Sequence, residues 1–486
     1  MNFRKLKKLK KMANTKIITG LGIGCALLIA SCRAPQLSHQ VENKNVPGAY
    51  NSPRDSANTA KVKWKDFFTD PNLASLIDTA LKNNQELNII MQEIRMANYE
   101  VMARKGAYLP MVGLQAGVGV EKAARYTRNG AVDATTNIDP AQKNPDLLPD
   151  YLLAANVSWE VDIWKKLRNA RKSAIYKYLS TTEGKNFMVT NLVSEIATSY
   201  YELMALDNQL IILRNNIEIQ QNALEIVKLE KIAARVTELA VKRFEAEVLK
   251  NQSRQFAILQ SITETENRIN FLVGRFPQPV SRSSQGFSDL IPDTIHSGIP
   301  SQLLENRPDI RQAEMDLAAA KLDVKVAKAN FYPSLFISGI AGYQAFNPKF
   351  LLNPESMVLA AAGQLMAPLI NRNAIKAVYY SASSRQVQAV YNYERTILNG
   401  YVEVSNQVAN INNLRQSYAL KAKQVEALTQ SITISTSLFK SARADYMEVL
   451  LTQRDALEAR FELVETKMQQ MNARVNIYRA LGGGWR

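Results

Sequence analysis

The placement of proline constrains this chain more than any other feature of its sequence. No proline occurs between Pro149 and Pro277, and none follows Pro368. Both proline-free stretches exceed about a hundred residues, contain little glycine and are rich in Ala, Leu, Gln, Glu, Lys and Arg, which favour helix. A continuous helix from Leu167 to Glu230 would be on the order of 100 Å long at about 1.5 Å per residue. We therefore predict helices longer than one globular core requires.

Apolar residues in the last stretch recur at alternating steps of four and three. The series is Leu457, Phe461, Val464, Met468, Met471, Val475 and Tyr478. This heptad spacing predicts a helix that packs against other helices, and it carries no information on function because any bundle helix shows it. The glycines from Gly482 to Gly484 predict the end of that helix.

The N-terminal segment has the features of a processing signal. Seven basic residues precede an apolar run from Ile17 to Ala30, which is shorter than the roughly 20 residues of a membrane-spanning helix. The run ends in Leu-Ile-Ala-Ser-Cys, which resembles the lipobox of bacterial lipoproteins. We expect removal of residues 1–31, a diacylglycerol on the sulfur of Cys32, and a lipidated tail over residues 32–70. An ordinary signal or a short membrane anchor is the alternative.

Composition argues against enzymes and nucleic-acid binders. Loss of the signal removes Cys25 and seven basic residues, so the mature chain would keep one acylated thiol and a net charge of about +9 instead of +16. Neither a disulfide nor a cysteine metal site can then form, and no basic cluster indicates nucleic acid. The two histidines, His39 and His296, lie in the tail and the connector, where a catalytic or metal site is hard to assemble. We predict no catalytic residues, no metal and no cofactor apart from the lipid on Cys32.

Two segments differ from the helical stretches because they mix β-branched, aromatic and small residues after a proline turn. The predicted strands are Val112 to Val120, Leu152 to Ile163, Ser334 to Ile340 and Met357 to Leu369. They form two hairpins, about 111–163 and 334–369, with strands of roughly ten residues, the length that crosses a membrane as tilted β-structure. A small soluble sheet that caps the helices would explain the pattern equally well.

The two halves of the chain align with each other. Residues 81–87 match 304–310 and, with the same offset, 107–110 match 330–333; further on, 159–168 match 366–375 and 232–236 match 440–444. The first copy has about sixteen extra residues near Arg125 to Pro149. We predict a tandem duplication of a helix, a β-hairpin and a long helical hairpin. Its parts are repeat 1 (71–276, hairpin tip near 231–237), a connector (277–300) and repeat 2 (301–486, hairpin tip near 440–446).

Four strands cannot close a membrane barrel, because the edge groups would face lipid unpaired. Closure requires further subunits, and since barrels usually have even strand numbers from eight upward, two, three or more copies would suffice. The helices would then project from the membrane into aqueous space.

Several motifs in the same order resemble the TolC-like outer-membrane efflux family. They are the Leu-Pro and Tyr-Pro turns, the segments 158–164, 305–310 and 445–450, and the ending Leu481-Gly-Gly-Gly-Trp485. The resemblance implies a mainly α protein with membrane β-structure: a homotrimer whose 12-stranded β-barrel continues into a 12-helix periplasmic α-barrel. The lipobox points to the lipoprotein branch that serves resistance-nodulation-division pumps. The implied partners are a periplasmic adaptor, an inner-membrane transporter of that class and outer-membrane lipid.

The resemblance also implies functional residues at the hairpin tips, which form the entrance that opens when the adaptor docks. The adaptor-contacting positions would be Ala234, Arg235, Ala442 and Arg443. The family usually has glycine where Ala234 and Ala442 stand, and alanine tolerates a left-handed turn less well. Alternatively, the two arginines only solvate a turn.

An acidic ring shortly after the second tip narrows the family's entrance, and Glu448 aligns with it. The family has a second acidic position one turn after the first, and this chain has Leu451 there instead. Asp455 lies a further turn along, and Asp445 precedes Glu448 in the tip. A ring of carboxylates would favour cations. Glu448 as an ordinary exposed helix residue is the alternative.

Two other protein classes deserve comparison. A lipid-anchored periplasmic adaptor would carry one helical hairpin flanked by β-domains, and a structural envelope coiled coil would not need strand pairs of membrane length. The sequence favours a passive channel from the periplasm to the exterior. It leaves the cargo open among drugs, metal ions and polypeptides, with small toxic compounds favoured by the lipoprotein branch.

Overall fold

The structure is a computed structural model of the 486-residue chain. It describes residues 34–37, 40–50, 57–137, 145–284, 286–290, 296–441 and 443–485. The chain divides into two compact units, which we call the sheet unit (up to Val41, Met96–Tyr178 and Asp316–Val390) and the helical unit (Glu42–Arg95, Leu179–Met315 and Tyr391–Arg486). Each unit combines segments from both halves of the sequence.

Helices make up most of the described chain, so the prediction of a mainly helical protein is confirmed. The helices are α2 (Trp64–Phe67), α3 (Pro71–Asn83), α4 (Gln85–Gly106), α5 (Arg128–Thr135), α6 (Lys166–Ile232), α7 (Glu238–Val273), α8 (Leu303–Asn306), α9 (Pro308–Ala329), α10 (Asn373–Lys440) and α11 (Tyr446–Ala480). Short 3-10 turns are η1 (Thr59–Lys61), η2 (Phe287–Asp289), η3 (Pro300–Gln302), η4 (Pro348–Phe350) and η5 (Pro354–Ser356). The two longest helices, α6 with 67 residues and α10 with 68, lie in the proline-free stretches. No helix in the described ranges is both long and apolar enough to cross a membrane.

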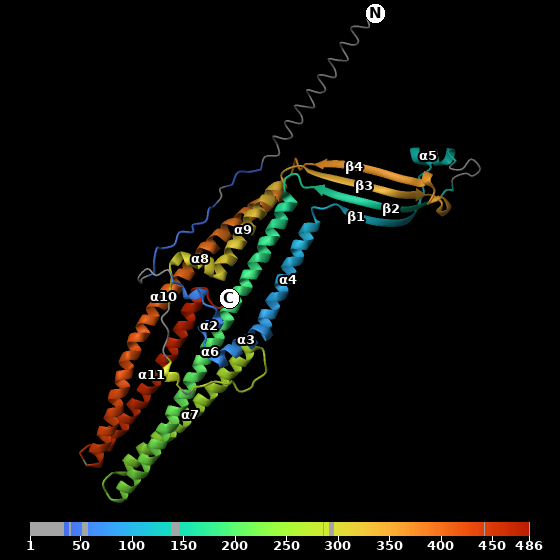
Figure 1. Ribbon diagram of the computed structural model, residues 1–486. Coiled ribbons are helices and arrows are strands. Elements are labelled where there is room, and N and C mark those ends of the chain that lie inside the picture. Colours follow the sequence, from blue (N-terminus) through green and yellow to red (C-terminus); the bar gives the residue numbers. More distant parts are fainter. Residues whose placement is uncertain are drawn as a thin grey trace, which may run out of the picture. The chain divides into compact units, whose positions relative to one another are not determined.

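The sheet unit contains one antiparallel sheet in the order β1-β2-β3-β4, visible as four adjacent arrows in Figure 1. The strands are β1 (Met111–Glu121), β2 (Leu148–Val161), β3 (Ser334–Ala345) and β4 (Met357–Met366). The hairpins β1/β2 and β3/β4 are joined by pairing of β2 with β3, in a register that sets Ser158 opposite Ser338. β2 begins four residues before its predicted start, and the β1–β2 connection contains α5, which the sequence did not predict.

Aromatic side chains gather where the sheet meets its flanking helices. The indole nitrogen of Trp159 donates to the carbonyl oxygen of Tyr108 at 3.1 Å, and that of Trp164 donates to Pro333 at 2.8 Å. The ring of Trp164 also stacks on Tyr332, with 4.7 Å between centroids. These contacts bind the ends of the strands to the segments that lead into them.

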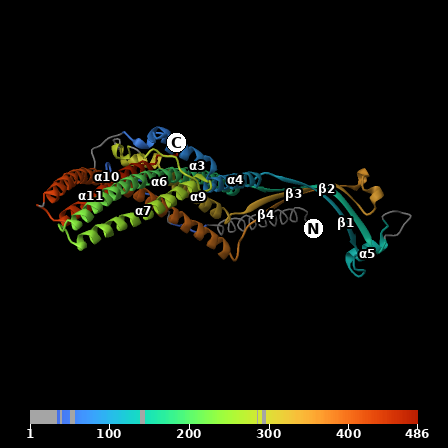
Figure 2. The ribbon, with the colours of Figure 1, turned by 90° about the horizontal axis from the view of Figure 1, so that it is seen from below.

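The helical unit holds the main hydrophobic core, built on α3, α6, α7 and α11. The predicted heptad series of α11 is buried in it, with Met468 partly buried, which confirms that this helix packs on its neighbours. Within this unit α6 runs beside α7 and α10 beside α11 in both views (Figure 1, Figure 2). Three aromatic residues from the predicted tail, Trp64, Phe67 and Phe68, are buried in the core, and Phe67 stacks on Tyr478 at 4.0 Å.

A joint that we call the first joint fastens the end of α7 to the α3–α4 turn. The buried Asn84 side chain donates to the carbonyl oxygen of Leu272 at 2.9 Å and accepts from the backbone N–H of Leu87 at 2.9 Å. Gly274, with φ 76°, follows α7, and a Cβ at this position would lie 2.5 Å from the Asn83 oxygen. Only glycine fits this close approach without strain.

A second joint fastens the end of α11 to the α8–α9 turn. The buried Arg307 guanidinium donates to the carbonyl oxygen of Ala480 at 2.8 Å, to Glu403 at 2.7 Å and to both carboxylate oxygens of Asp309 at 3.0 and 2.6 Å. Burial alone would lower the pKa of Arg307, and the two carboxylates outweigh burial, so this pKa lies above its ordinary value. Gly482, with φ 91°, follows α11, and a Cβ there would lie 2.5 Å from the Asn306 oxygen.

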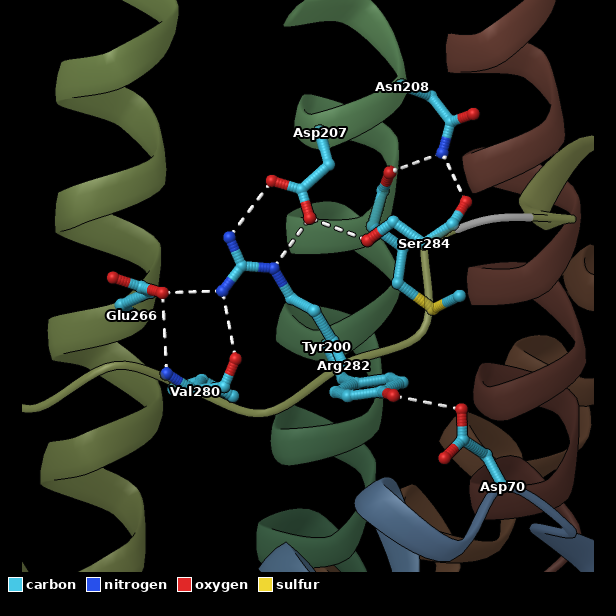
Figure 3. A network of polar contacts seen from close by, with 9 residues as sticks. Asp70, Tyr200, Asp207, Asn208, Glu266, Val280, Arg282 and Ser284 are labelled. Carbon is cyan, nitrogen blue, oxygen red and sulfur yellow. Dashed lines mark hydrogen bonds and ion pairs between the residues drawn. The ribbon is translucent and has the colours of Figure 1, made fainter. Parts of the chain in front are cut away.

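The connector between the halves is pinned to the α6/α7 pair by Arg282 (Figure 3). Its guanidinium binds both carboxylate oxygens of Asp207 on α6, at 2.6 and 2.9 Å, and also pairs with Glu266 on α7. The hydrogen bond to Asp207 raises the pKa of Arg282 despite the opposing effect of burial. Ser284 donates to the same carboxylate of Asp207, so one network joins both helices to the connector.

Candidate functional site

The two hairpin tips, both in the helical unit, have turns of the same form. The backbone N–H of Arg235 donates to Glu230 at 2.9 Å, and that of Arg443 donates to Leu438 at 2.9 Å. Both arginine side chains are exposed. Ala234 has φ 56°, so the left-handed conformation expected for this position is present with alanine, at a strain of roughly 1–2 kcal/mol.

An ion pair closes the first tip at its base. The ammonium of Lys231, at the end of α6, pairs with the carboxylate of Glu238, in the first turn of α7. The hydrogen bond from Lys231 lowers the pKa of Glu238. Both side chains are exposed, so solvent screens the pair and its contribution to stability is small.

The predicted gate carboxylates lie at the start of α11, and the two within the helix share one exposed face. Asp445 precedes the helix, Glu448 lies in its first turn, and Asp455 follows two turns later, about 10 Å along the axis. All three are exposed, as is Leu451, 39% exposed, between the two helical acids. Asp455 pairs with Arg454 at 3.0 Å, which partly neutralises its charge.

A small hydrophobic cluster, which we call the tip cluster, supports the tips from within. Its buried residues are Leu224, Val227, Ala240, Val241, Phe244, Val248 and Leu450. They come from α6, α7 and α11, so the acidic start of α11 is packed against the first hairpin. Further along, Arg254 of α7 binds Glu458 of α11 at 2.7 Å and covers the ring of Phe461 at 4.1 Å.

The structure thus brings most of the predicted site residues together at the tips of one unit. Cys32 and Ala442 lie outside the described residues. No group of three or more His, Cys, Asp or Glu side chains within the described ranges is arranged to hold a metal ion. Sequence reasoning missed three buried amides in this region, Gln220, Asn251 and Gln453. Their signal was available, since each interrupts an apolar heptad series with a polar residue.

One known protein family matches most of the chain. The sequence pattern of the family described as "Outer membrane efflux protein" matches residues 76–275 and 299–483. The two matched segments flank the connector that Arg282 pins.

Individual relatives agree with this match over nearly their whole length. The pyoverdine export outer membrane protein OpmQ of Pseudomonas aeruginosa is 27% identical over 433 residues, covering 89% of each chain. The probable outer membrane lipoprotein SilC of Salmonella typhimurium is 23% identical, covering 96% of this chain and 98% of its own. The open state of the Neisseria gonorrhoeae MtrE outer membrane channel superposes with a TM-score of 0.81 at 20% identity, covering 93% of this chain and 98% of MtrE. That structure establishes a shared fold.

Proposed function

This chain belongs to the outer membrane efflux protein family and is an outer-membrane channel component of an efflux pump, and we propose that it works as a homotrimer. In this trimer three four-stranded sheets form a 12-stranded barrel, and the long helices form a 12-helix periplasmic tunnel. Such a channel conducts passively and needs no catalytic centre. A lipid-anchored adaptor or a purely structural coiled coil is set aside, because neither belongs to this family.

The observation that supports assembly of several copies is the sheet itself, while the number three follows from the family resemblance. Its strand order leaves β1 and β4 at the edges, and edge strands in lipid must pair with another chain. Apolar side chains project from these strands, with Leu114 on β1 88% exposed and Leu359 on β4 73% exposed. Addition of β4 of one copy to β1 of the next would satisfy the edges and turn such side chains toward lipid.

The aromatic contacts at the foot of the sheet support a membrane boundary there, because tryptophan and tyrosine prefer the interface between lipid and water. Within the sheet unit, Ala34 and Leu37 pack against a cluster that includes Phe331 and Tyr379. Cys32 lies outside the described residues, two positions before Ala34 in the sequence. We propose that a lipid on Cys32 anchors the chain in the outer membrane.

The exposed tips support docking of a periplasmic adaptor, which would connect the channel to an inner-membrane resistance-nodulation-division transporter. Arg235 and Arg443 sit at equivalent places in the two turns and offer cationic donors. Asp445 lies just before α11, and Glu448 and Asp455 lie on one exposed face of that helix. Three copies of this face would form acidic rings that make the entrance selective for cations.

Recovery of the protein tests the assembly. Purified from the outer-membrane fraction in mild detergent, the full-length chain should migrate as a heat-labile trimer and form ion-conducting pores in planar lipid bilayers. Recovery only as an inner-membrane or soluble monomer would contradict the proposed channel.

The acidic entrance predicts a specific change in selectivity. Glu448→Gln removes three charges from a trimeric ring and keeps the side-chain size, so the cation-over-anion permeability ratio should fall about two-fold or more. The ratio is measured in bilayers under a salt gradient. Glu426→Gln, at an exposed position of α10, is the matched control. An unchanged ratio in Glu448→Gln would remove this residue from the gate.

A further inference from the structure

Buried polar side chains interrupt the apolar packing of the helices between the hairpin tips and the main core. On α6 the residues Leu213, Ile217, Gln220, Leu224 and Val227 follow one another at steps of four and three. All are buried, and Gln220 is 0% exposed. A glutamine therefore occupies a core position in an otherwise apolar heptad series, where it specifies register at a cost in stability.

The neighbouring helices carry amides that are buried in the same way. Asn251 on α7 is 1% exposed, and its side-chain nitrogen donates to the side-chain oxygen of Gln220 at 2.8 Å. Gln453 on α11 is 5% exposed. We call Gln220, Asn251 and Gln453 the amide layer.

On every one of these helices the amide separates two hydrophobic clusters. The tip cluster ends at Leu224 on α6, Val248 on α7 and Leu450 on α11. The main core resumes at Ile217, Ile258 and Leu457 on the same three helices. The tip cluster is therefore a separate core, with polar side chains between it and the rest of the helical unit.

The layer is also incompletely hydrogen-bonded. Within the described chain, Nε2 of Gln220 and Oε1 of Gln453 are buried without a hydrogen-bond partner, as is Oδ1 of Asn216 one turn away. Burying such an atom costs free energy, and the cost is removed when water reaches the atom. The helices are therefore packed less stably at this level than an apolar layer would allow, and separating them here costs less free energy.

The second hairpin contributes Gln453 to the layer but has no counterpart of the Gln220–Asn251 pair. The offset that aligns 232–236 with 440–444 sets Leu428 against Gln220 and Ala459 against Asn251. An aliphatic pair therefore stands where the first hairpin has hydrogen-bonded amides, so the amides are not a requirement of the hairpin fold.

We propose that the amide layer is a hinge that uncouples the tip cluster from the main core, so that the entrance opens as a local unit. The Gln220–Asn251 hydrogen bond keeps α6 and α7 in register, while the polar level gives way more readily than apolar packing. The role in opening rests on the proposed channel function; the uncoupling itself does not.

Hydrogen exchange of the full-length protein in detergent tests the uncoupling. Amides of α6 and α7 on the tip side of the layer should exchange at least ten-fold faster than those just beyond it, with a step at residues 220 and 251. A gradual rise from the core to the tip, without a step, would overturn the proposal. This measurement needs no variant.

Filling the layer tests its cause. The variant Gln220→Met/Asn251→Leu/Gln453→Met should slow exchange on the tip side about ten-fold or more and remove the step. The control Gln221→Met/Asn222→Leu changes two exposed neighbours on α6 in the same way and should leave the step in place. Unchanged exchange in the filled variant would show that the amides are not responsible.

Bilayer recordings separate the two proposals. The filled variant should open several-fold less often than the control. Slower exchange with unchanged opening would overturn the role of the layer at the entrance. Wild-type protein that forms no pore would refute the proposed function, while the exchange step would still decide whether the layer uncouples the tips.

Discussion

The first and second joints perform the same task with different chemistry. In both, a polar side chain from a turn donates to a backbone carbonyl oxygen at the end of a long helix. The acceptor is Leu272, the second-last residue of α7, in the first joint and Ala480, the last residue of α11, in the second. A glycine in the left-handed conformation follows in each case. The same offset that aligns the hairpin tips relates Leu272 to Ala480 and Gly274 to Gly482. The first joint uses the neutral Asn84, and the second uses the charged Arg307.

The two copies therefore share the backbone geometry of the joint and differ in the side chain that makes its hydrogen bond. A neutral amide needs only its two hydrogen bonds, whereas a buried guanidinium needs carboxylates to offset its desolvation. Asp309 and Glu403 supply them, and Gly400 leaves space for the guanidinium, since a Cβ there would lie 3.2 Å from Arg307. The second joint therefore depends on more residues and should be more costly to break.

The largest effect is expected from Arg307→Leu. This change leaves Asp309, Glu403 and the Ala480 carbonyl without their donor, so the free energy of unfolding should fall by about 3 kcal/mol or more. Urea unfolding of the detergent-solubilised protein, followed by circular dichroism, measures it. Arg415→Leu, at an exposed position of α10, is the control and should change little.

A compensated variant sharpens the comparison. Arg307→Asn/Asp309→Asn/Glu403→Gln converts the second joint into a neutral one, and it should recover much of the stability lost in Arg307→Leu. No recovery would mean that the charges at the second joint do more than offset one another.

The glycines should give an intermediate and equal effect. Gly274→Ala and Gly482→Ala each force alanine into a left-handed conformation and set a Cβ 2.5 Å from a carbonyl oxygen, so each should cost about 2 kcal/mol. Gly106→Ala is the control, because a Cβ there meets nothing within 4 Å. A large loss at one glycine and none at the other would show that the two joints differ in their backbones.

Local rules account for the parts of this fold that the sequence predicted. The long helices follow from missing prolines, the packing of α11 from its heptad series, and the left-handed Ala234 from the position of the tip turn. In each case the cause lies within a few residues of the effect. The position of the acidic residues on one face of α11 follows from helical spacing in the same way.

Long-range pairings could not be predicted in that manner. Arg307 meets Glu403 and Ala480 across 96 and 173 residues, and Arg282 meets Asp207 across 75. The sequence shows a charge in each case and does not show its partner. The amide layer was detectable as polar residues on apolar seams, yet only three-dimensional packing reveals that its members lie between two separate cores.

The smallest effect at the joints is expected from Asn84→Ala. The variant loses the hydrogen bond to Leu272 and the one that Asn84 accepts from Leu87, at a cost of about 1–1.5 kcal/mol, because no charge is left buried. Asn84→Ser keeps a neutral acceptor at the start of α4 and removes the amide donor to Leu272, so its comparison with Asn84→Ala separates the two contributions. Asn88→Ala, exposed in the first turn of α4, is the control. If Asn84→Ala lowered the free energy of unfolding as much as Arg307→Leu, the distinction between a neutral and a charged joint would be contradicted. Both joints would then depend mainly on the hydrogen bond to the end of the helix, which they share.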